Sequence, residues 1–231
     1  MDDGMLNNYE ILAPILEKHG LTALFAVCPA LIDRKIPYIW RDYVFLLSQQ
    51  GVHLPNGKGP ADFNRQTRDF KKYIYDNEVA DIYGFIATFC VKNDIENLNN
   101  DPLRFTCMTW PQIQELSKRG HQIASHTTTH RVLKFLSEEE KKEELQQSKH
   151  RLEAQLKIPI DTLVYPYGSM AEIDQATVNM AKEVGYKRAL MNVRAHHLEE
   201  SAFTQTRFAF PNSTDHAHVY AIASGYKFLF R

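Results

Sequence analysis

Two short motifs carry side chains that could bind a metal ion. Asp2 and Asp3 are adjacent near the start of the chain, and His126 and His130 stand four positions apart further on. This spacing puts both imidazoles on one side of a helical turn, so that one ion can meet both. A carboxylate from Asp2 or Asp3 would complete a site of two histidines and one carboxylate, with positions left open for water.

The elements around these motifs predict how they come together. By itself the histidine pair is a weak signal, because most such pairs are solvated or satisfied in a core. However, a strand at 121–126 ends at the first histidine, a strand at 161–168 ends in Tyr-Pro-Tyr-Gly, and the two aspartates precede a helix at 6–18. Since the carboxyl ends of parallel strands carry the chemistry of α/β folds, we expect all three motifs at one rim.

Strands and helices alternate along most of the chain, which favours an α/β fold with a mainly parallel sheet. The near-continuous apolar run 21–28 is typical of a strand buried on both faces. Ser137 begins a long helix over 137–156 as its N-cap, followed by acidic residues. The other expected strands are 186–192 and 206–212, and the other expected helices are 38–51, 109–120, 171–185 and 213–225.

The segment 51–107 breaks this regular alternation. Its first part, 51–63, holds several turn-forming residues and reads as a loop, and a polar surface helix is expected over 65–78. The apolar stretch 82–91 is either a strand or another buried segment, and 92–105 is expected to be a loop. We interpret the whole segment as an elaboration on a core fold and not as a separate domain.

On these motifs the chain resembles the polysaccharide deacetylases, which are carbohydrate esterase family four with the NodB-homology domain. The family's motifs T-F-D-D-G, H-[ST]-x-x-H and Y-P-Y-G are matched here by residues 1–4, 126–130 and 165–168, and the stretches 109–126 and 136–153 are also typical of it. The resemblance covers essentially the whole chain. It implies a distorted (β/α) barrel, one catalytic domain over 1–231, and metal-dependent removal of an acetyl group from an N-acetylated sugar or oligosaccharide.

The resemblance also implies a role for each matching residue. Asp3, His126 and His130 would be the ligands of one divalent ion, with zinc expected ahead of Co²⁺, Ni²⁺ or Fe²⁺. Asp2 would be the general base that takes a proton from metal-bound water. The backbone N–H of Tyr167 would hold the oxyanion of the tetrahedral intermediate.

The chain departs from the family pattern in three places. Val164 stands where the family's R-x-P-Y motif has an arginine; Arg207 could reach the site instead, although a surface or strand-edge position is an equal alternative. The general acid is not evident, and His216 and His218 are the candidates, with a capped helix start as the alternative. Finally, no strand precedes the aspartates, so we expect either an upstream start or a lost first strand, with the edges at 21–28 and near 206–210 left unpaired.

His196 and His197 lie in a polar stretch and are expected to be solvated.

Composition limits the classes of partner. The chain of 231 residues has a formal net charge of -1, which implies no general attraction to nucleic acid or to anionic membranes. No stretch has the length of a membrane span, and the start lacks the pattern of a signal peptide, so a cytoplasmic location is expected. Cys28, Cys90 and Cys107 form no metal-binding or disulfide pattern and are expected to be buried or idle thiols.

Three functions from different classes remain open on the sequence. The first is a metal-dependent carbohydrate N-deacetylase. The second is a non-catalytic relative that binds glycan or metal, and the third is a hydrolase of the same fold that acts on a non-sugar amide. Assembly into a homo-oligomer is also left open.

Overall fold

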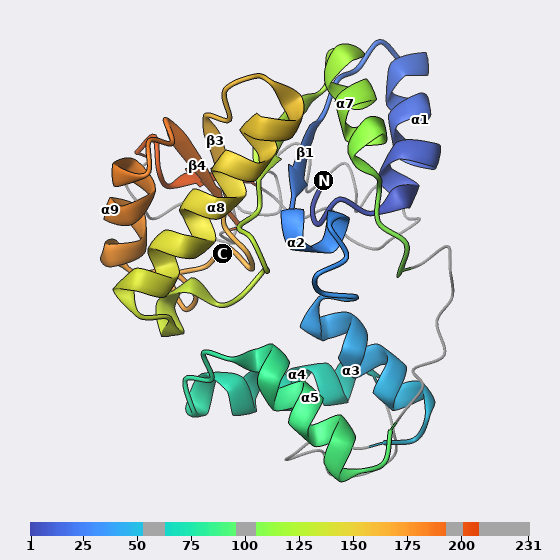
Figure 1. Ribbon diagram of the computed structural model, residues 1–231, viewed down its shortest axis with the longest axis vertical. Coiled ribbons are helices and arrows are strands. Elements are labelled where there is room, and N and C mark those ends of the chain that lie inside the picture. The colour runs from blue at the N-terminus through green and yellow to red at the C-terminus, as the bar shows by residue number, and fades with distance from the viewer. Residues whose placement is uncertain (53–62, 96–104, 193–200, 208–231) are drawn as a thin grey trace, which may run out of the picture.

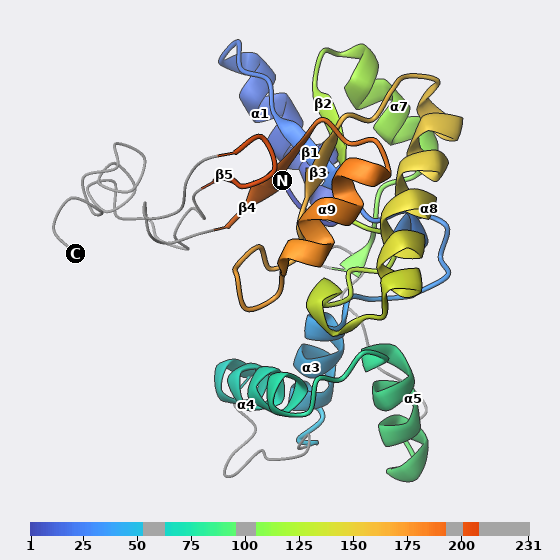
Figure 2. The ribbon, with the colours of Figure 1, turned by 90° about the vertical axis from the view of Figure 1, so that its left-hand side faces the viewer.

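The computed structural model describes residues 1–52, 63–95, 105–192 and 201–207, without the side chains of 63–66. Within these parts the strands form one parallel sheet in the order in which they occur along the chain (Figures 1 and 2). The expected α/β fold with a parallel sheet is therefore confirmed. The strands are β1 (Leu24–Val27), β2 (Gln122–Ser125), β3 (Thr162–Val164), β4 (Arg188–Met191) and β5 (Gln205–Thr206).

The register of the sheet brings the ends of the strands to one rim. Val27 of β1 pairs with Ser125 of β2, and Val164 of β3 pairs with Leu190 of β4. The residues that follow each strand, including His126 after β2 and Arg207 after β5, therefore leave the sheet on the same side. This is the arrangement that the sequence predicted for its motifs.

The helices around the sheet agree closely with the sequence pattern. Ser137 caps α8 with a reciprocal capping box, in which Glu140 N donates to the serine hydroxyl and Ser137 N donates to the glutamate. α9 begins later than expected because Asp174 caps it, accepting from Thr177 N at 2.7 Å. The helices of this part are η1 (Asn8–Leu12), α1 (Ala13–Lys18), α2 (Pro29–Ile32), α7 (Trp110–Lys118), η2 (Leu133–Phe135), α8 (Glu138–Leu156) and α9 (Gln175–Glu183).

A second, smaller group of helices lies at one end of the molecule, below the sheet in Figure 1. It comprises α3 (Trp40–Gln49), α4 (Phe63–Asp76) and α5 (Ile82–Lys92), which we call the helical unit. These helices pack around their own apolar cluster, formed by Trp40, Val44, Leu47, Phe70, Ile74, Ile82 and Ile86. α4 and α5 lie within the segment that we interpreted as an elaboration, whereas α3 precedes it.

The apolar stretch 82–91, for which the sequence left a strand open, is the helix α5. Asp81 is its N-cap and accepts from Gly84 N at 2.9 Å. Ile82 and Ile86, one helical turn apart, are both buried against the rest of the helical unit. Burial among other helices, and not in a sheet, explains these two positions, whereas Val91 at the end of the stretch is exposed.

Met1 lies along the outer edge of β1. Its amino group donates to Leu24 O at 2.8 Å and its carbonyl accepts from Ala26 N at 2.7 Å. β1 and β5 are the outermost strands of the described sheet, so the edge expected to be unpaired at 21–28 carries these two hydrogen bonds, and most of the other expected edge, 206–210, lies outside the described residues. The expectation of a strand before Asp2 stays a prediction.

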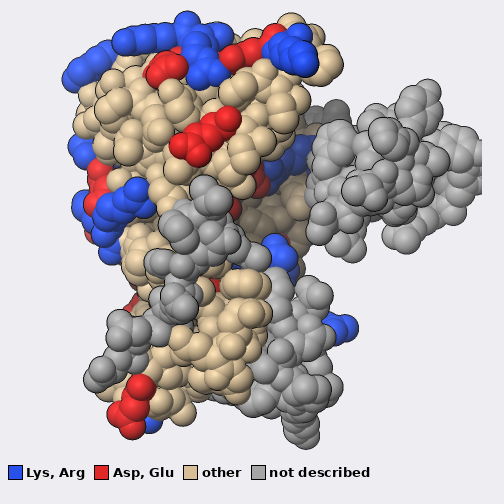
Figure 3. Space-filling model, turned by 90° about the vertical axis from the view of Figure 1, so that its right-hand side faces the viewer, with Lys and Arg blue, Asp and Glu red and all other residues tan. Residues whose placement is uncertain are grey.

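Surface features agree with the balanced charge of the chain. On the face shown in Figure 3, basic and acidic side chains are interspersed over the part that contains the sheet. No helix of the described residues has both the length and the apolar character that crossing a membrane requires. Cys28, Cys90 and Cys107 are free thiols. The expected helix over 213–225, the expected strand beyond 207, and His196, His197, His216 and His218 lie outside the described residues.

Candidate metal centre

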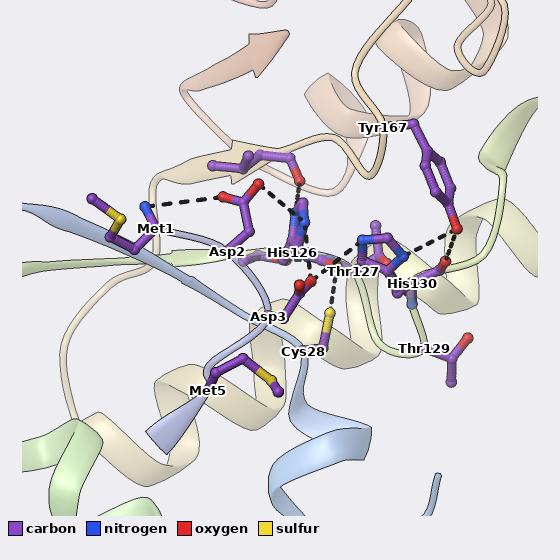
Figure 4. Close-up of polar contacts among 12 residues, drawn as sticks. Met1, Asp2, Asp3, Met5, Cys28, His126, Thr127, Thr129, His130 and Tyr167 are labelled. Carbon is purple, nitrogen blue, oxygen red and sulfur yellow. Dashed lines mark hydrogen bonds and ion pairs between the residues drawn. The ribbon is translucent and has the colours of Figure 1, made fainter. Parts of the chain in front are cut away.

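The three predicted metal ligands meet at the rim of the sheet (Figure 4). Asp3 Oδ1 lies 3.6 Å from His126 Nε2 and 3.4 Å from His130 Nε2. One ligand atom from each residue lies within 4.8 Å of the others. Because side chains from two distant parts of the sequence converge on one point, they form a group that could bind a metal ion.

The donor set fits a divalent ion. Asp3 Oδ1 is buried and has no hydrogen-bond partner among the described residues, which is costly for a carboxylate oxygen unless a cation is present. Two imidazole nitrogens and one carboxylate oxygen are ligands that zinc and similar ions accept. Three protein ligands would also leave a position for water, as catalytic zinc sites require.

The ring of His126 is fixed by the end of β3. Its Nδ1 lies 2.6 Å from Val164 O, and a carbonyl can only accept a hydrogen bond. Nδ1 therefore carries the proton, and Nε2 presents its lone pair toward Asp3. The Cys28 thiol also donates to the carbonyl of His126, at 3.0 Å (Figure 4).

The ring of His130 is held by Tyr167. The tyrosine hydroxyl donates to His130 O at 3.2 Å and lies 3.2 Å from His130 Nδ1, from which it can accept. Trp40 Nε1 donates to the same hydroxyl. Burial lowers the pKa of His130 to about 4, although Asp3 acts in the opposite direction. The imidazole is therefore neutral at pH 7, which is the form that binds a metal.

A buried carboxylate that the sequence analysis missed organises the histidine loop. Glu144 of α8 is 3% exposed and accepts from the backbone N–H groups of Thr128 and Thr129 at 2.9 and 2.8 Å. It also accepts from the Thr129 hydroxyl and from Arg131 Nε. The sequence carries no clear signal for it, because the buried face of this polar helix also contains Lys141 and Ser148.

The backbone at the site adopts conformations that L-residues rarely take. Half of the non-glycine residues with positive φ in the described chain are at this site, namely Asp3, Thr127, His130 and Tyr167 at 71°, 62°, 61° and 61°. Such residues cost of order 1–3 kcal/mol each and persist only where the surroundings hold them. Their concentration here indicates that the loops are held in place for a function.

Asp2 lies beside the three converging ligands and is paired with Arg207. The guanidinium donates to both carboxylate oxygens, each at 2.7 Å, while Asp2 Oδ2 is 3.8 Å from His126 Nε2. Arg207 therefore reaches the site from its position directly after the outermost strand β5. Burial alone would raise the pKa of Asp2, but the hydrogen bonds and the charge of the Arg207 guanidinium act against it, and this pKa lies well below its ordinary value.

Tyr167 presents its backbone to the same site. Within the described parts of the chain its N–H has no hydrogen-bond acceptor. Gly168 permits this turn, because a Cβ there would lie 2.5 Å from Asn192 N. A pocket of about 290 Å³ opens over the site, with one wall from the strand ends and another from Trp40, Arg41, Thr67 and Lys71 of the helical unit.

Comparisons with known proteins agree with this architecture. The family model for polysaccharide deacetylase matches residues 1–189. No curated protein matches the chain in a sequence search. Solved structures of the same fold include a Streptococcus pyogenes deacetylase, PplD, in complex with acetate, at 15% identity with a TM-score of 0.58, covering 96% of this chain and 67% of that one.

Two further solved structures show the same fold at similar distance. A de-N-acetylase from Aggregatibacter actinomycetemcomitans is 15% identical with a TM-score of 0.55, over 96% of this chain and 72% of that one. IcaB from Ammonifex degensii is 16% identical with a TM-score of 0.55, over 95% and 70%. The distorted (β/α) barrel type expected from the sequence is thus confirmed. The chain belongs to the polysaccharide deacetylase family.

Proposed function

We propose that this protein is a metal-dependent N-deacetylase that hydrolyses the acetamido group of an N-acetylated sugar or oligosaccharide to acetate and the free amine. One observation carries the proposal: a carboxylate oxygen of Asp3 that has no hydrogen-bond partner among the described residues faces two histidine Nε2 atoms, while both oxygens of the adjacent Asp2 accept from Arg207. This difference in partners supports one carboxylate as the metal ligand and its neighbour as the base. The family and the deacetylases of the same fold support the substrate class.

The metal site would consist of Asp3, His126 and His130, and we propose zinc as the ion. When bound, such an ion polarises the amide carbonyl and lowers the pKa of a water molecule. The protein contributes the remaining polar groups around it, which lie along the same pocket.

Each of these groups has one task in the proposed reaction. Asp2, ionised and held by two bonds to Arg207, accepts a proton from the attacking water. The free N–H of Tyr167 donates to the oxygen of the acetamido group as negative charge develops there. The C–N bond then breaks, and the amine leaves with a proton from a general acid, for which His216 and His218 remain the candidates from the sequence.

A metal titration with a turnover assay tests the proposal. Acetate release from an N-acetylated chitooligosaccharide should disappear with a chelator and return on addition of zinc. His126→Ala should bind zinc weaker by orders of magnitude, because the remaining groups no longer offset dehydration of the ion. His150→Ala, an exposed histidine on α8, is the matched control and should bind zinc as the unaltered protein does.

Three outcomes would contradict parts of this proposal. Equal zinc affinity in His126→Ala would overturn the ligand assignment. Binding of glycan and zinc without acetate release would indicate a non-catalytic relative. Activity on acetylated amines other than sugars, with none on the oligosaccharide, would change the substrate class.

A further inference from the structure

Each helix of the helical unit donates a side-chain hydrogen bond to one of the loops that form the metal centre. From α3, Trp40 Nε1 donates to the Tyr167 hydroxyl. From α5, the Tyr83 hydroxyl donates to Thr129 O at 2.8 Å, in the loop between the two histidines. From α4, Lys71 and Tyr75 both donate to Glu172, which follows the Tyr-Pro-Tyr-Gly turn.

We propose that the helical unit is a positioning element for the metal centre, acting through Trp40, Tyr75 and Tyr83 on the two loops that hold His130. This inference rests on the proposed metal site. It assigns a role to residues that the catalytic motifs do not contain, in a part of the chain that the sequence analysis treated as an elaboration.

The link through α3 is the most direct. Tyr167 Oη receives Trp40 Nε1–H and can receive His130 Nδ1–H, while its own proton goes to His130 O. With both acceptor positions and the donor engaged, the hydroxyl has one orientation. That orientation keeps the His130 ring where Nε2 faces Asp3 (Figure 4).

The link through α4 fixes the loop that carries Tyr167. The side chain of Glu172 is 2% exposed, and it accepts from Lys71 Nζ at 3.0 Å and from Tyr75 on the helical unit. On its own loop it accepts from Ser169, through both the backbone N–H at 3.0 Å and the hydroxyl. A buried carboxylate with this many donors ties α4 to the turn, because a lost donor leaves part of its charge uncompensated.

The link through α5 reaches the other loop. Thr129 precedes His130, and its carbonyl accepts from Tyr83 while its N–H donates to Glu144. The peptide group before Thr129 is thereby held by α8, and the peptide group after it by α5. Since His130 has a φ of 61°, this restraint acts on a residue whose backbone is strained.

Three substitutions remove one donor each: Tyr75→Phe and Tyr83→Phe keep the ring, and Trp40→Phe replaces the indole by a smaller aromatic ring. Two others serve as matched controls. Tyr73→Phe removes a hydroxyl on α4 that has no hydrogen bond in the described chain. Trp110→Phe, on α7, removes an indole N–H that donates to Asp33 at 2.8 Å. Tyr75 and Tyr83 do not line the pocket, so their loss removes no substrate contact.

Zinc affinity, the visible spectrum of the Co²⁺-loaded protein and thermal unfolding are measured on all variants. The triple variant should bind zinc about 10–100-fold weaker, the range expected when partners of metal ligands are lost, and its Co²⁺ bands should shift. Both controls should keep the native affinity and spectrum. If the triple variant does not fold, the single variants carry the test, each with a smaller loss and a spectral shift.

The results separate this inference from the proposed function. Native zinc affinity and an unchanged Co²⁺ spectrum in the three donor variants would overturn the positioning role while leaving the deacetylase proposal intact. A loss of melting temperature without any change at the metal would show that these bonds only join the two parts of the molecule. Failure of the unaltered protein to bind zinc or Co²⁺ would overturn the proposed function and this inference together.

Discussion

Arg207 and Asp2, 205 positions apart in the sequence, face each other with two parallel hydrogen bonds of 2.7 Å. Such a pairing fixes the plane of the carboxylate as well as its position. Val164 occupies the position that the arginine has in the family's R-x-P-Y motif. Arg207, which follows β5, contacts Asp2 instead.

The first prediction concerns this pairing. Arg207→Lys keeps the charge but can hold only one carboxylate oxygen, so Asp2 should lose its fixed orientation. We expect kcat for deacetylation to fall about 10–100-fold, as for a misplaced catalytic group, with zinc affinity unchanged. Arg188→Lys, on β4 and bonded to Thr162, is the control and should retain full kcat. A parallel loss of zinc affinity in Arg207→Lys would argue that Arg207 supports the ligands and not the base.

A second prediction concerns Glu144, whose carboxylate accepts from the loop between the histidines. Glu144→Gln replaces one carboxylate oxygen by an NH2 group, which cannot accept a hydrogen bond. Some of the N–H donors that face Glu144, which include those of Thr128 and Thr129, therefore lose their acceptor. Zinc affinity, measured by competition with a chromophoric chelator, should fall about 10–100-fold. Glu143→Gln, one position earlier and exposed, should leave it unchanged. Equal affinities in the two variants would contradict the role given to Glu144.

A third prediction uses the pH dependence of stability. Burial tends to raise the pKa of Glu172, but bonds from Ser169, Tyr75 and Lys71 outweigh this and lower it below its ordinary value of 4.5. Because the folded pKa is depressed, the stabilisation is present above about pH 4.5 and is lost as the pH falls through the folded value. The free energy of unfolding should therefore decrease less between pH 6 and pH 3 for Glu172→Gln than for the unaltered protein. Parallel pH profiles would show that the carboxylate contributes no such stabilisation.

The sequence could predict the two histidine ligands because they follow a strand, β2, whose apolar run is legible, and parallel strands bring such ends to one rim. Asp3 has no strand before it in the described chain, and its assignment came from the family's motif. The same logic could not identify Glu144, since its importance comes from a loop 15 positions away that only the fold places against α8.

The helical unit was the part least accessible to sequence reasoning. Over 82–91 the apolar residues are too continuous for their period to separate a helix from a buried strand, and Asp81 as N-cap was the one local signal. The bonds from Trp40 to Tyr167 and from Tyr83 to Thr129 span 127 and 46 positions. Aromatic residues at helical spacing read as packing, and nothing local marks a hydroxyl or an indole as a donor to a distant loop.

The division of labour between the two adjacent aspartates is the central claim, and paired measurement of bound zinc and turnover in Asp2→Asn and Asp3→Asn tests it most directly. Asp2→Asn should retain zinc and lose about 10²–10⁴-fold in kcat, the contribution of a general base. Asp3→Asn should lose zinc affinity and, with it, turnover at limiting zinc. Loss of zinc from Asp2→Asn together with its retention in Asp3→Asn would contradict the account, because the two roles would then be reversed.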